Sequence, residues 1–417
     1  WVFGNKVVKV DSNDVMTAIG TLNTSTGRCW LACTDYHLIV VDGADGFYYD
    51  GTTFAVLGGG FPASPTHVIA TGFYFLVNNS GTGDIYQSNF APNLAAVPTT
   101  WAVTVYANAE ARPDFLPAIW ATNREVWLLG EYTTEIYYNA GAQLTSTTSE
   151  FVFLPMNGGV IDWGIEAKYS ITAHGSSMFW VGRQEGGTGQ IVMTKGFAVD
   201  PISTPDIDYQ LSQMTAIDDA FSFTYLQAGH AFVVFTFPTG DKTFVYDITT
   251  GTWHERKSYG MGRHRAAGHC YFNNFHYVGD FSNPSLYTWD LKTYTDNGDE
   301  IERIRRAPIL HKKNLLIQHD SLIVEMQGGV GLTADERTVA TGTAYSYSAG
   351  TISGLTFTSP YEIGGVLEDD EFTDDSTGGS ATVSVVGSAT LTASSGATGM
   401  DGGAFTVKRA TPPMMMI

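Results

Sequence analysis

Short apolar runs alternate with polar turns along this chain, and one arrangement of them occurs six times. Each copy has an apolar strand, a turn of Gly, Asn, Asp or Thr, and a second strand rich in Tyr, Phe or Trp. The copies are Leu38–Phe54, Phe73–Asn89, Val126–Ala140, Met178–Gly196, Phe232–Trp253 and Phe275–Asp290. Their first residues are 35 to 54 positions apart. Because strand-only repeats of roughly 40–50 residues are typical of β-propellers, the pattern predicts a six-bladed propeller.

Three copies contain an aromatic residue followed by aspartate, and a turn comes next. These pairs are Tyr49-Asp50, Tyr246-Asp247 and Trp289-Asp290. An aspartate side chain accepts hydrogen bonds from backbone amides two residues on, and this closes a turn. We therefore interpret these carboxylates as structural groups that cap hairpins.

The composition of the chain changes beyond Pro308. Leu315–Met326 still has the pattern of a strand, but from Thr333 onward Ser, Thr, Gly and Ala dominate. We expect a propeller domain over residues 1–310 and a C-terminal β-rich region or arm over residues 311–417, which could form an interface. The predicted fold class is all-β, a six-bladed β-propeller with this additional region.

Composition supports an all-β protein. Aromatic residues make up 13% of the chain and glycines number 46, a balance that favours strands and turns. Helix is expected only near Asp218–Phe223 and Glu300–Arg306. No run of about 18 apolar residues is present, so we expect no membrane-spanning segment. Trp1 stands where an initiator methionine is usual, so we expect a trimmed N-terminus.

The chain is strongly acidic, with a net charge of −20. Such a charge repels nucleic acid and argues against sequence-specific DNA binding, although it permits DNA to slide past. The three cysteines, Cys29, Cys33 and Cys270, form no metal or disulfide pattern, and we expect them to be reduced and buried. Six histidines also lack metal-ligand spacing, so no metal and no cofactor is expected. They are His254, His264, His269, His276, His311 and His319.

Basic residues are concentrated late in the propeller region. Residues 251–313 hold 10 Lys and Arg against 7 Asp and Glu, a local net charge of +3. Three interpretations stay open: a subunit interface, a solvated face, or contact with DNA phosphate. We favour the interface, with the following candidate residues: Arg256, Lys257, Arg263, Arg265, Arg303, Arg305 and Arg306.

Several segments together resemble one family. They include Ala109–Gly141 (AEARPDFLPAIWATNREVWLLGEYTTEIYYNAG), Gly158–Ser170 (GGVIDWGIEAKYS), Thr252–Arg256 (TWHER) and Gly262–Arg265 (GRHR). In order and spacing, over roughly Leu38–Leu332, they resemble the tail hub or nozzle proteins of short-tailed phages, also called packaged-DNA stabilisation proteins.

This resemblance implies a non-enzymatic structural protein of the virion tail, assembled in the host cytoplasm. It implies a homo-hexameric ring below an adaptor ring on the portal, with tail fibres or spikes as further partners. The ring would retain packaged DNA and then let it pass through the lumen without sequence-specific binding. The alternative is a propeller that binds carbohydrate or a receptor through exposed aromatic side chains. No catalytic residues are expected, because the sequence shows no convergent carboxylates or arginine triad of a glycosidase.

Overall fold

The computed structural model divides the chain into two compact units, Trp1–Arg303 and Ile304–Ile417. The structure describes residues 1–58, 60–102, 115–122, 125–140, 152–291, 293, 295–301, 304, 338–348, 351–357, 371–374, 380–386, 391–393 and 404–408.

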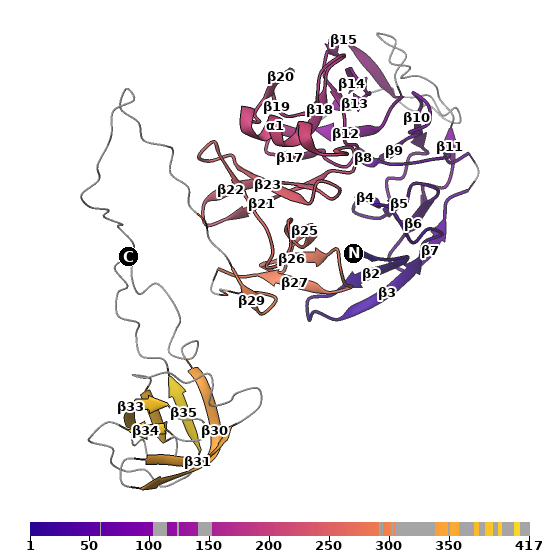
Figure 1. The fold of residues 1–417 in the computed structure, drawn as a ribbon. Helices are drawn as coiled ribbons and strands as arrows, with labels where there is room; N and C mark the ends of the chain where they lie inside the picture. The colour runs from indigo at the N-terminus through magenta and orange to yellow at the C-terminus, as the bar shows by residue number, and fades with distance from the viewer. Residues whose placement is uncertain are drawn as a thin grey trace, which may run out of the picture. The chain divides into compact units, whose positions relative to one another are not determined.

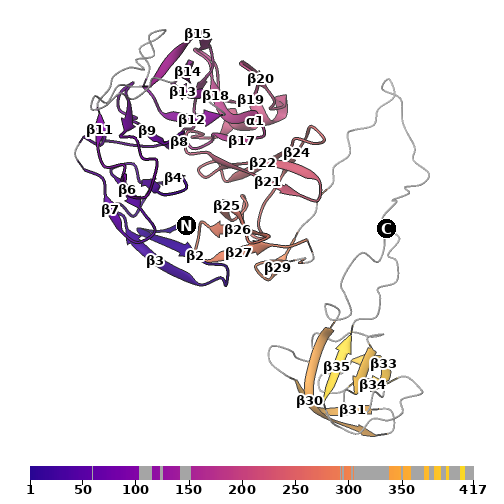
Figure 2. The same cartoon turned by 180° about the vertical axis from the view of Figure 1, so that it is seen from behind.

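The first unit is an all-β propeller, which confirms the predicted fold type, but it has seven blades and the predicted number of six is wrong. Figures 1 and 2 show the blades arranged around a common axis. Blade 1 contains β1 (Val2–Phe3), β2 (Lys6–Val10) and β3 (Met16–Thr21), and blade 2 contains β4 (Trp30–Cys33), β5 (Leu38–Val41), β6 (Gly46–Tyr49) and β7 (Phe54–Val56). Blade 3 contains β8 (Val68–Thr71), β9 (Tyr74–Asn78), β10 (Ile85–Ser88) and β11 (Trp101–Ala102). Blade 4 contains β12 (Ala118–Thr122), β13 (Glu125–Leu129), β14 (Thr134–Asn139) and β15 (Phe153–Ile161).

The last three blades follow the same antiparallel order. They contain β16 (Gly164–Ile165), β17 (Thr172–His174), β18 (Ser177–Arg183), β19 (Gln190–Lys195), β20 (Ala198–Pro201); β21 (Phe221–Gln227), β22 (His230–Phe237), β23 (Lys242–Asp247), β24 (Thr252–Glu255); β25 (Ala266–Phe272), β26 (Phe275–Asp280) and β27 (Leu286–Trp289). A separate two-stranded sheet, β28 (Thr295–Asp296) with β29 (Asp299–Glu300), comes after blade 7.

All six repeated hairpins lie in blades 2 to 7, and the blade missed by the sequence pattern is the first. Its central strand β2 includes two exposed lysines, Lys6 and Lys9, and only Val7 is fully buried there. Its partner β3 contains no aromatic residue. Because the repeat was defined by an apolar run followed by an aromatic strand, blade 1 carries too little of either signal to match it.

One helix, α1 (Pro205–Gln213), lies between blades 5 and 6, and the expected helix at Asp218–Phe223 is wrong. The side chain of Thr204 caps α1 by accepting a hydrogen bond from the Ile207 amide, and Pro205 occupies its first turn. Residues 218–223 instead enter strand β21, where Phe221 and Phe223 are buried. The second expected helix, Glu300–Arg306, lies mostly outside the described residues.

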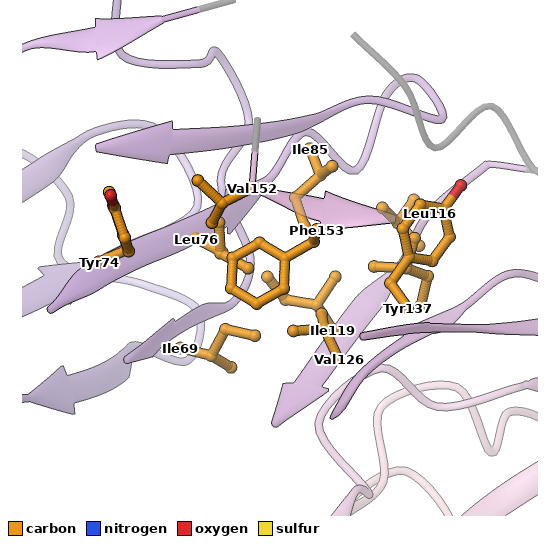
Figure 3. Packing of buried hydrophobic residues seen from close by; sticks show 11 residues of the cluster. Ile69, Tyr74, Leu76, Ile85, Leu116, Ile119, Val126, Tyr137, Val152 and Phe153 are labelled. Atoms are coloured by element: carbon orange, nitrogen blue, oxygen red, sulfur yellow. The ribbon is translucent and has the colours of Figure 1, made fainter. Parts of the chain in front are cut away.

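In blades 2, 3, 4, 6 and 7 the first strand lies nearest the axis, and in blade 5 β17 takes this position beside β18. Contacts join β4 to β8, β8 to β12, β17 to β21 and β21 to β25, so these strands form an inner ring. The main apolar cores lie between neighbouring blades. Figure 3 shows the core between blades 3 and 4, where Leu76, Ile119 and Phe153 are buried among the other labelled side chains. Burial of these facing sheets is the main stabilising contribution.

The aspartate turns have the structural role that the sequence predicts. Asp50 Oδ1 accepts hydrogen bonds from the amides of Thr52 and Thr53, at 2.9 and 2.6 Å. Asp247 Oδ1 accepts one from the Thr249 amide at 2.9 Å, and its Oδ2 accepts one from Thr250 Oγ1 at 2.7 Å. The hairpin-capping interpretation is confirmed at both positions.

The cysteines are free thiols, but they are not buried as expected. Cys33 and Cys270 are exposed and Cys29 is half-buried. Cys33 lies on the inner strand β4, whose alternate residues Leu31 and Cys33 turn towards solvent. The burial of a cysteine therefore cannot be predicted from its residue type alone when one face of its strand is open to solvent.

The second unit contains a closed β-barrel of six strands in the order β30-β31-β34-β33-β32-β35. These strands are β30 (Thr338–Ser348), β31 (Thr351–Phe357), β32 (Glu371–Asp374), β33 (Ser380–Val386), β34 (Leu391–Ala393) and β35 (Phe405–Lys408). Tyr345, Phe372 and Phe405 are buried together, with the two Phe rings stacked 4.9 Å apart.

Candidate interaction surface and propeller axis

A tight loop between blades 6 and 7 carries part of the predicted basic cluster. The Ser258 amide donates to the Arg263 carbonyl at 3.2 Å, and the Met261 amide donates to the Ser258 carbonyl at 3.0 Å. The Arg265 amide donates to Ser258 Oγ at 3.1 Å. These bonds hold the loop in one conformation, because the buried residue Ser258 makes hydrogen bonds to Met261, Arg263 and Arg265.

The loop presents a cation beside exposed aromatic groups. The guanidinium carbon of Arg263 lies 3.8 Å from the centre of the Phe281 ring, which is in cation–π contact. Phe281 is 42% exposed and Tyr259, in the same loop, is 59% exposed. We call Tyr259, Arg263 and Phe281 the loop patch. Arginine and large aromatic side chains are the residue types enriched at energetically dominant positions of protein interfaces.

Arg265, one of the predicted interface residues, is not exposed on the surface of the subunit. Its side chain is 6% exposed and lies 3.1 Å from Asp280, 3.2 Å from Asp296 and 3.9 Å from Asp299. The ion pairs join the residue directly before β25 to the end of β26 and to the β28–β29 hairpin. They raise the pKa of Arg265 although burial acts in the opposite direction. Arg265 therefore holds the last blade together.

Arg256 lies in a third environment. Its Nη2 donates to the hydroxyl of Tyr225 at 2.8 Å, and its guanidinium carbon lies 5.5 Å from the Trp289 ring centre. Lys257 follows it in the loop and is exposed. Arg303, Arg305 and Arg306 lie outside the described residues. The basic stretch therefore serves at least three purposes and does not form one uniform face.

The histidines near this region form an aromatic cluster. Nε2 of His269 lies 2.9 Å from Nδ1 of His276, and both rings lie near Tyr225. Burial lowers the pKa of His269 to about 4, with His276 as the second cause. Among the described residues no group of three or more His, Cys, Asp or Glu side chains could hold a metal ion. His311 and His319 lie outside that part of the chain.

Side chains from separate blades meet at the propeller axis, a feature that the sequence pattern did not identify. We call Trp30, His67, Trp120 and Tyr169 the axial cluster. The ring of Trp30 lies 4.2 Å from His67, 6.0 Å from Trp120 and 6.3 Å from Tyr169. Trp30 is on β4, Trp120 is on β12, and His67 directly precedes β8. Aromatic residues at the first strand of successive repeats are the signal that could have located this cluster.

Arg28 extends the axial contacts to the last two blades. Its guanidinium carbon lies 3.7 Å from the Phe221 ring centre, and its Nη2 donates to the Ala267 carbonyl at 2.6 Å. The hydroxyl of Tyr169 donates to the Arg28 carbonyl at 3.1 Å. Side chains contributed by blades 2 to 6, with the backbone of blade 7, therefore fill the axis.

Ionisation at the axis is suppressed by burial. Desolvation lowers the pKa of His67 to about 3, and the charge of Lys168 acts in the same direction. Desolvation likewise raises the pKa of Tyr169 to about 12 and lowers that of Arg28 to about 10. His67 and Tyr169 are therefore neutral near pH 7, so they act as packing groups.

Among the described residues, no helix is both long and apolar enough to cross a membrane.

No curated protein matches the chain. Two solved structures are similar at low identity. They are a candidate 6-phosphogluconolactonase from Bacteroides fragilis NCTC 9343 (10% identity, 68% of this chain and 88% of that one, TM-score 0.44) and Hsv2 from Kluyvelomyces marxianus (8% identity, 79% and 88%, TM-score 0.34).

A family model described as "Bacteriophage P22 Gp10, beta-propeller" matches residues 1–294, which is more than half of the chain. The matched residues span all seven blades. A phage structural family agrees with the non-enzymatic role expected from the sequence. The chain therefore belongs to this family of phage structural proteins, and its first unit is the family's β-propeller.

Proposed function

We propose that this protein forms the distal nozzle, or hub, ring of a short phage tail. Six copies would close into a ring below the adaptor ring, with tail fibres or spikes as further partners. The ring would retain packaged DNA and act as the conduit for its ejection. The proposal is supported by membership of a phage structural propeller family and by the packing of the propeller itself.

The filled axis is the observation that carries this proposal. Trp30, His67 and Tyr169 occupy the space that a ligand-binding or conducting propeller would leave open, and His67 is 0% exposed. Close-packed aromatic side chains leave no room for a DNA duplex. The propeller is thus a solid building block, and a DNA path would run between propellers around a larger channel.

The charge of the chain suits such a channel. Each contact between a cation and a phosphate strengthens DNA binding and slows departure. A chain of net charge −20 can present carboxylates or neutral polar groups to the lumen, so DNA would slide with weak attachment. Closure before infection would then be steric, made by loops that block the path, while cations such as Arg263 would serve contacts between proteins.

A closed ring needs two different faces on each subunit, because its interfaces are heterologous. The loop patch is our candidate for one face. Arg263 there lies over the exposed ring of Phe281, and an acidic neighbour would supply the complementary charge. Arg256 and Lys257 flank this loop, whereas Arg265 is excluded because it is buried.

Electron microscopy of the purified full-length chain, alone and with its adaptor protein, tests the proposal. We expect six-fold rings with propellers around a central opening wide enough for DNA. Monomers that stay monomeric in the presence of the adaptor would contradict it. A map in which Arg and Lys side chains dominate the narrowest part of the lumen would contradict the idea that DNA slides through it with weak attachment.

A receptor- or carbohydrate-binding role is the second candidate, and exposed aromatic residues favour it. Tyr271, Phe272 and Phe275 flank the Asn273-Asn274 turn of blade 7, and they are 58%, 41% and 50% exposed. Aromatic rings of this kind stack on sugars or fill pockets of a protein partner. A monomeric protein that binds a glycan array would favour this role over the nozzle.

A further inference from the structure

The helix α1, between blades 5 and 6, turns one side to the core and the other to solvent (Figure 1). Ile207 and Leu211 are buried in the apolar cluster that joins these two blades. Asp206, Tyr209 and Gln213 are spaced by three and four positions, so they share the outward side of the helix. We call these three residues the α1 face. Tyr209 is 64% exposed, the largest exposed fraction among the large apolar side chains of the described residues.

The α1 face is acidic. The helix contains Asp206 and Asp208 and has no lysine or arginine. Asp206 Oδ2 accepts a hydrogen bond from Gln210 Nε2 at 3.0 Å, and Asp208 Oδ2 accepts one from Gln190 Nε2 at 2.9 Å. Both donors are neutral amides, so these bonds leave the negative charge in place. An aromatic ring beside a carboxylate is complementary to a surface with a cation and further aromatic rings.

The loop patch has these properties, and it lies close to the α1 face on the same subunit. Both surfaces belong to segments that connect one blade to the next. The β22–β23 turn lies between them. On one side of this turn Gly240 packs against Met214, the residue directly after α1, and on the other side Asp241 packs against Gly262, the residue directly before Arg263. The two surfaces therefore flank a single turn.

We propose that the loop patch of one subunit binds the α1 face of the next, and that this contact closes the ring. The inference rests on the proposed function, because it identifies the two faces that a ring subunit needs. Arg263 meets Asp206, and Tyr209 packs with the exposed rings of Tyr259 and Phe281. Arginine and large aromatic side chains are the residues that contribute most to the energy of protein interfaces.

A second copy of this chain fits these surfaces better than a different partner, because both halves of the contact are on the chain itself. Two loop patches would bring one Arg263 against another, and two α1 faces would bring one Asp206 against another. Like charges disfavour a two-fold dimer through either surface. Pairing of opposite surfaces is heterologous, and repeated heterologous contacts close into a ring.

The closeness of the two surfaces places the contact near the lumen. One sixth of a turn about the ring axis carries the α1 face of one subunit onto the loop patch of its neighbour. Seen along the axis, the two surfaces of one subunit and the axis form an equilateral triangle. The contact therefore lies as far from the axis as the two surfaces lie from each other. Asp241, in the turn between them, and Asp219, which accepts hydrogen bonds from Thr239 of that turn, would then be near the lumen, where carboxylates suit weak attachment of DNA.

Charge reversal of each half, alone and in combination, tests the proposal in the full chain. Arg263→Glu and Asp206→Arg should each weaken ring association at least about tenfold, because each brings like charges together. The double variant makes every contact Glu to Arg and should form rings again. A mixture of the two single variants should also form rings, because a ring of six can alternate the two kinds of subunit so that every contact joins opposite charges. Multi-angle light scattering measures the mass in each case.

Asp35→Arg is the matched control for the charge change, because Asp35 is exposed in the β4–β5 turn of blade 2. This variant should form rings alone, and it should not restore rings when it is mixed with Arg263→Glu. The Tm of each variant is also measured, since a carboxylate in the first turn of a helix stabilises it and Asp206 has this position. If Asp206→Arg lowers the Tm, Tyr209→Ser takes its place, with an expected loss of association of about tenfold.

Three results would overturn the contact. Rings of unchanged mass in Arg263→Glu and in Asp206→Arg, or in Tyr209→Ser, would reject these surfaces while the ring itself stands. Failure of both the double variant and the mixture to form rings, with native Tm, would show that the two charges do not meet. A native chain that forms no ring, alone or with its adaptor, would reject the proposed function and this contact with it.

Discussion

Nη2 of Arg28 donates a 2.6 Å hydrogen bond to the carbonyl oxygen of Ala267, and this bond joins the entry to blade 2 with the innermost strand of blade 7. The two residues are 239 positions apart in the chain. The same guanidinium stacks over Phe221 of blade 6. One side chain thus connects blades 2, 6 and 7.

Replacing Arg28 should weaken the closure of the propeller. We expect Arg28→Met to lower the free energy of unfolding by about 2 kcal/mol, because it removes the hydrogen bond to Ala267 and the cation–π contact with Phe221. Urea unfolding of the full chain measures this. Lys6→Met is the control: Lys6 donates to Thr21 on the exposed surface of blade 1, and its loss should cost less than about 0.5 kcal/mol. Equal effects of the two variants would contradict a bridging role for Arg28.

His67 should make the propeller sensitive to acid. Its folded pKa is lowered to about 3, below the ordinary value of 6.5, so the unfolded chain binds a proton between these limits and the folded chain does not. Stability is therefore fully present above pH 6.5 and is lost as the pH falls towards 3. Between pH 6.5 and pH 5 we therefore expect His67 to lower the free energy of unfolding by about 2 kcal/mol.

His67→Phe keeps an aromatic ring beside Trp30 and removes the titrating group. We expect this variant to lose about 2 kcal/mol less stability than the native chain between pH 6.5 and pH 5, measured by urea unfolding at each pH. His174→Phe, outside the axial cluster, is the control. The same pH dependence in His67→Phe and the native chain would show that His67 is not the group responsible.

Arg265 should be essential to blade 7. Arg265→Met would leave Asp280, whose side chain is 0% exposed, without its cation, and we expect a loss of about 4 kcal/mol. Lys195→Met gives the comparison, because its ion pair with Asp200 is exposed and worth less than about 0.5 kcal/mol. Urea unfolding distinguishes the two. A small loss for Arg265→Met would mean that Asp280 is held by Ser282 and Asn283 alone.

Local features of this fold could be predicted from the sequence, and long-range ones could not. The hairpins and the turns at Asp50 and Asp247 depend on residues only a few positions apart, so a repeat and a turn rule locate them. The axial cluster joins residues from Trp30 to Tyr169, and no local pattern records that these rings meet. Blade 1 was missed because only Val7 of β2 is fully buried and β3 contains no aromatic residue.

The basic stretch shows the same limit at the level of the site. Arg263 and Arg265 are two positions apart and look equivalent in the sequence, yet one lies over Phe281 at the surface and the other is buried among three carboxylates. The difference comes from Asp280 and Asp296, which β26 and the β28–β29 hairpin bring to Arg265. The composition shows where positive charge is concentrated in the chain. It does not show which arginine is structural and which is exposed.

Ring assembly should depend on Arg263. If the loop patch meets an acidic face of the next subunit, Arg263→Glu replaces attraction with repulsion at a desolvated contact and should shift the protein from rings to monomers, with at least about a tenfold weaker association.

Multi-angle light scattering at low and moderate salt measures the mass of the assembly. Lys195→Glu changes the net charge by the same amount on β19 of blade 5 and serves as the control. The charge of Arg263 also interacts with Asp241 and Asp219 within the subunit, so the Tm of the variant is measured beside its mass to separate loss of assembly from loss of folding. Rings of unchanged mass in Arg263→Glu at both salt concentrations would remove the loop patch from the interface, while loss of rings in both variants would point to net charge instead of this contact.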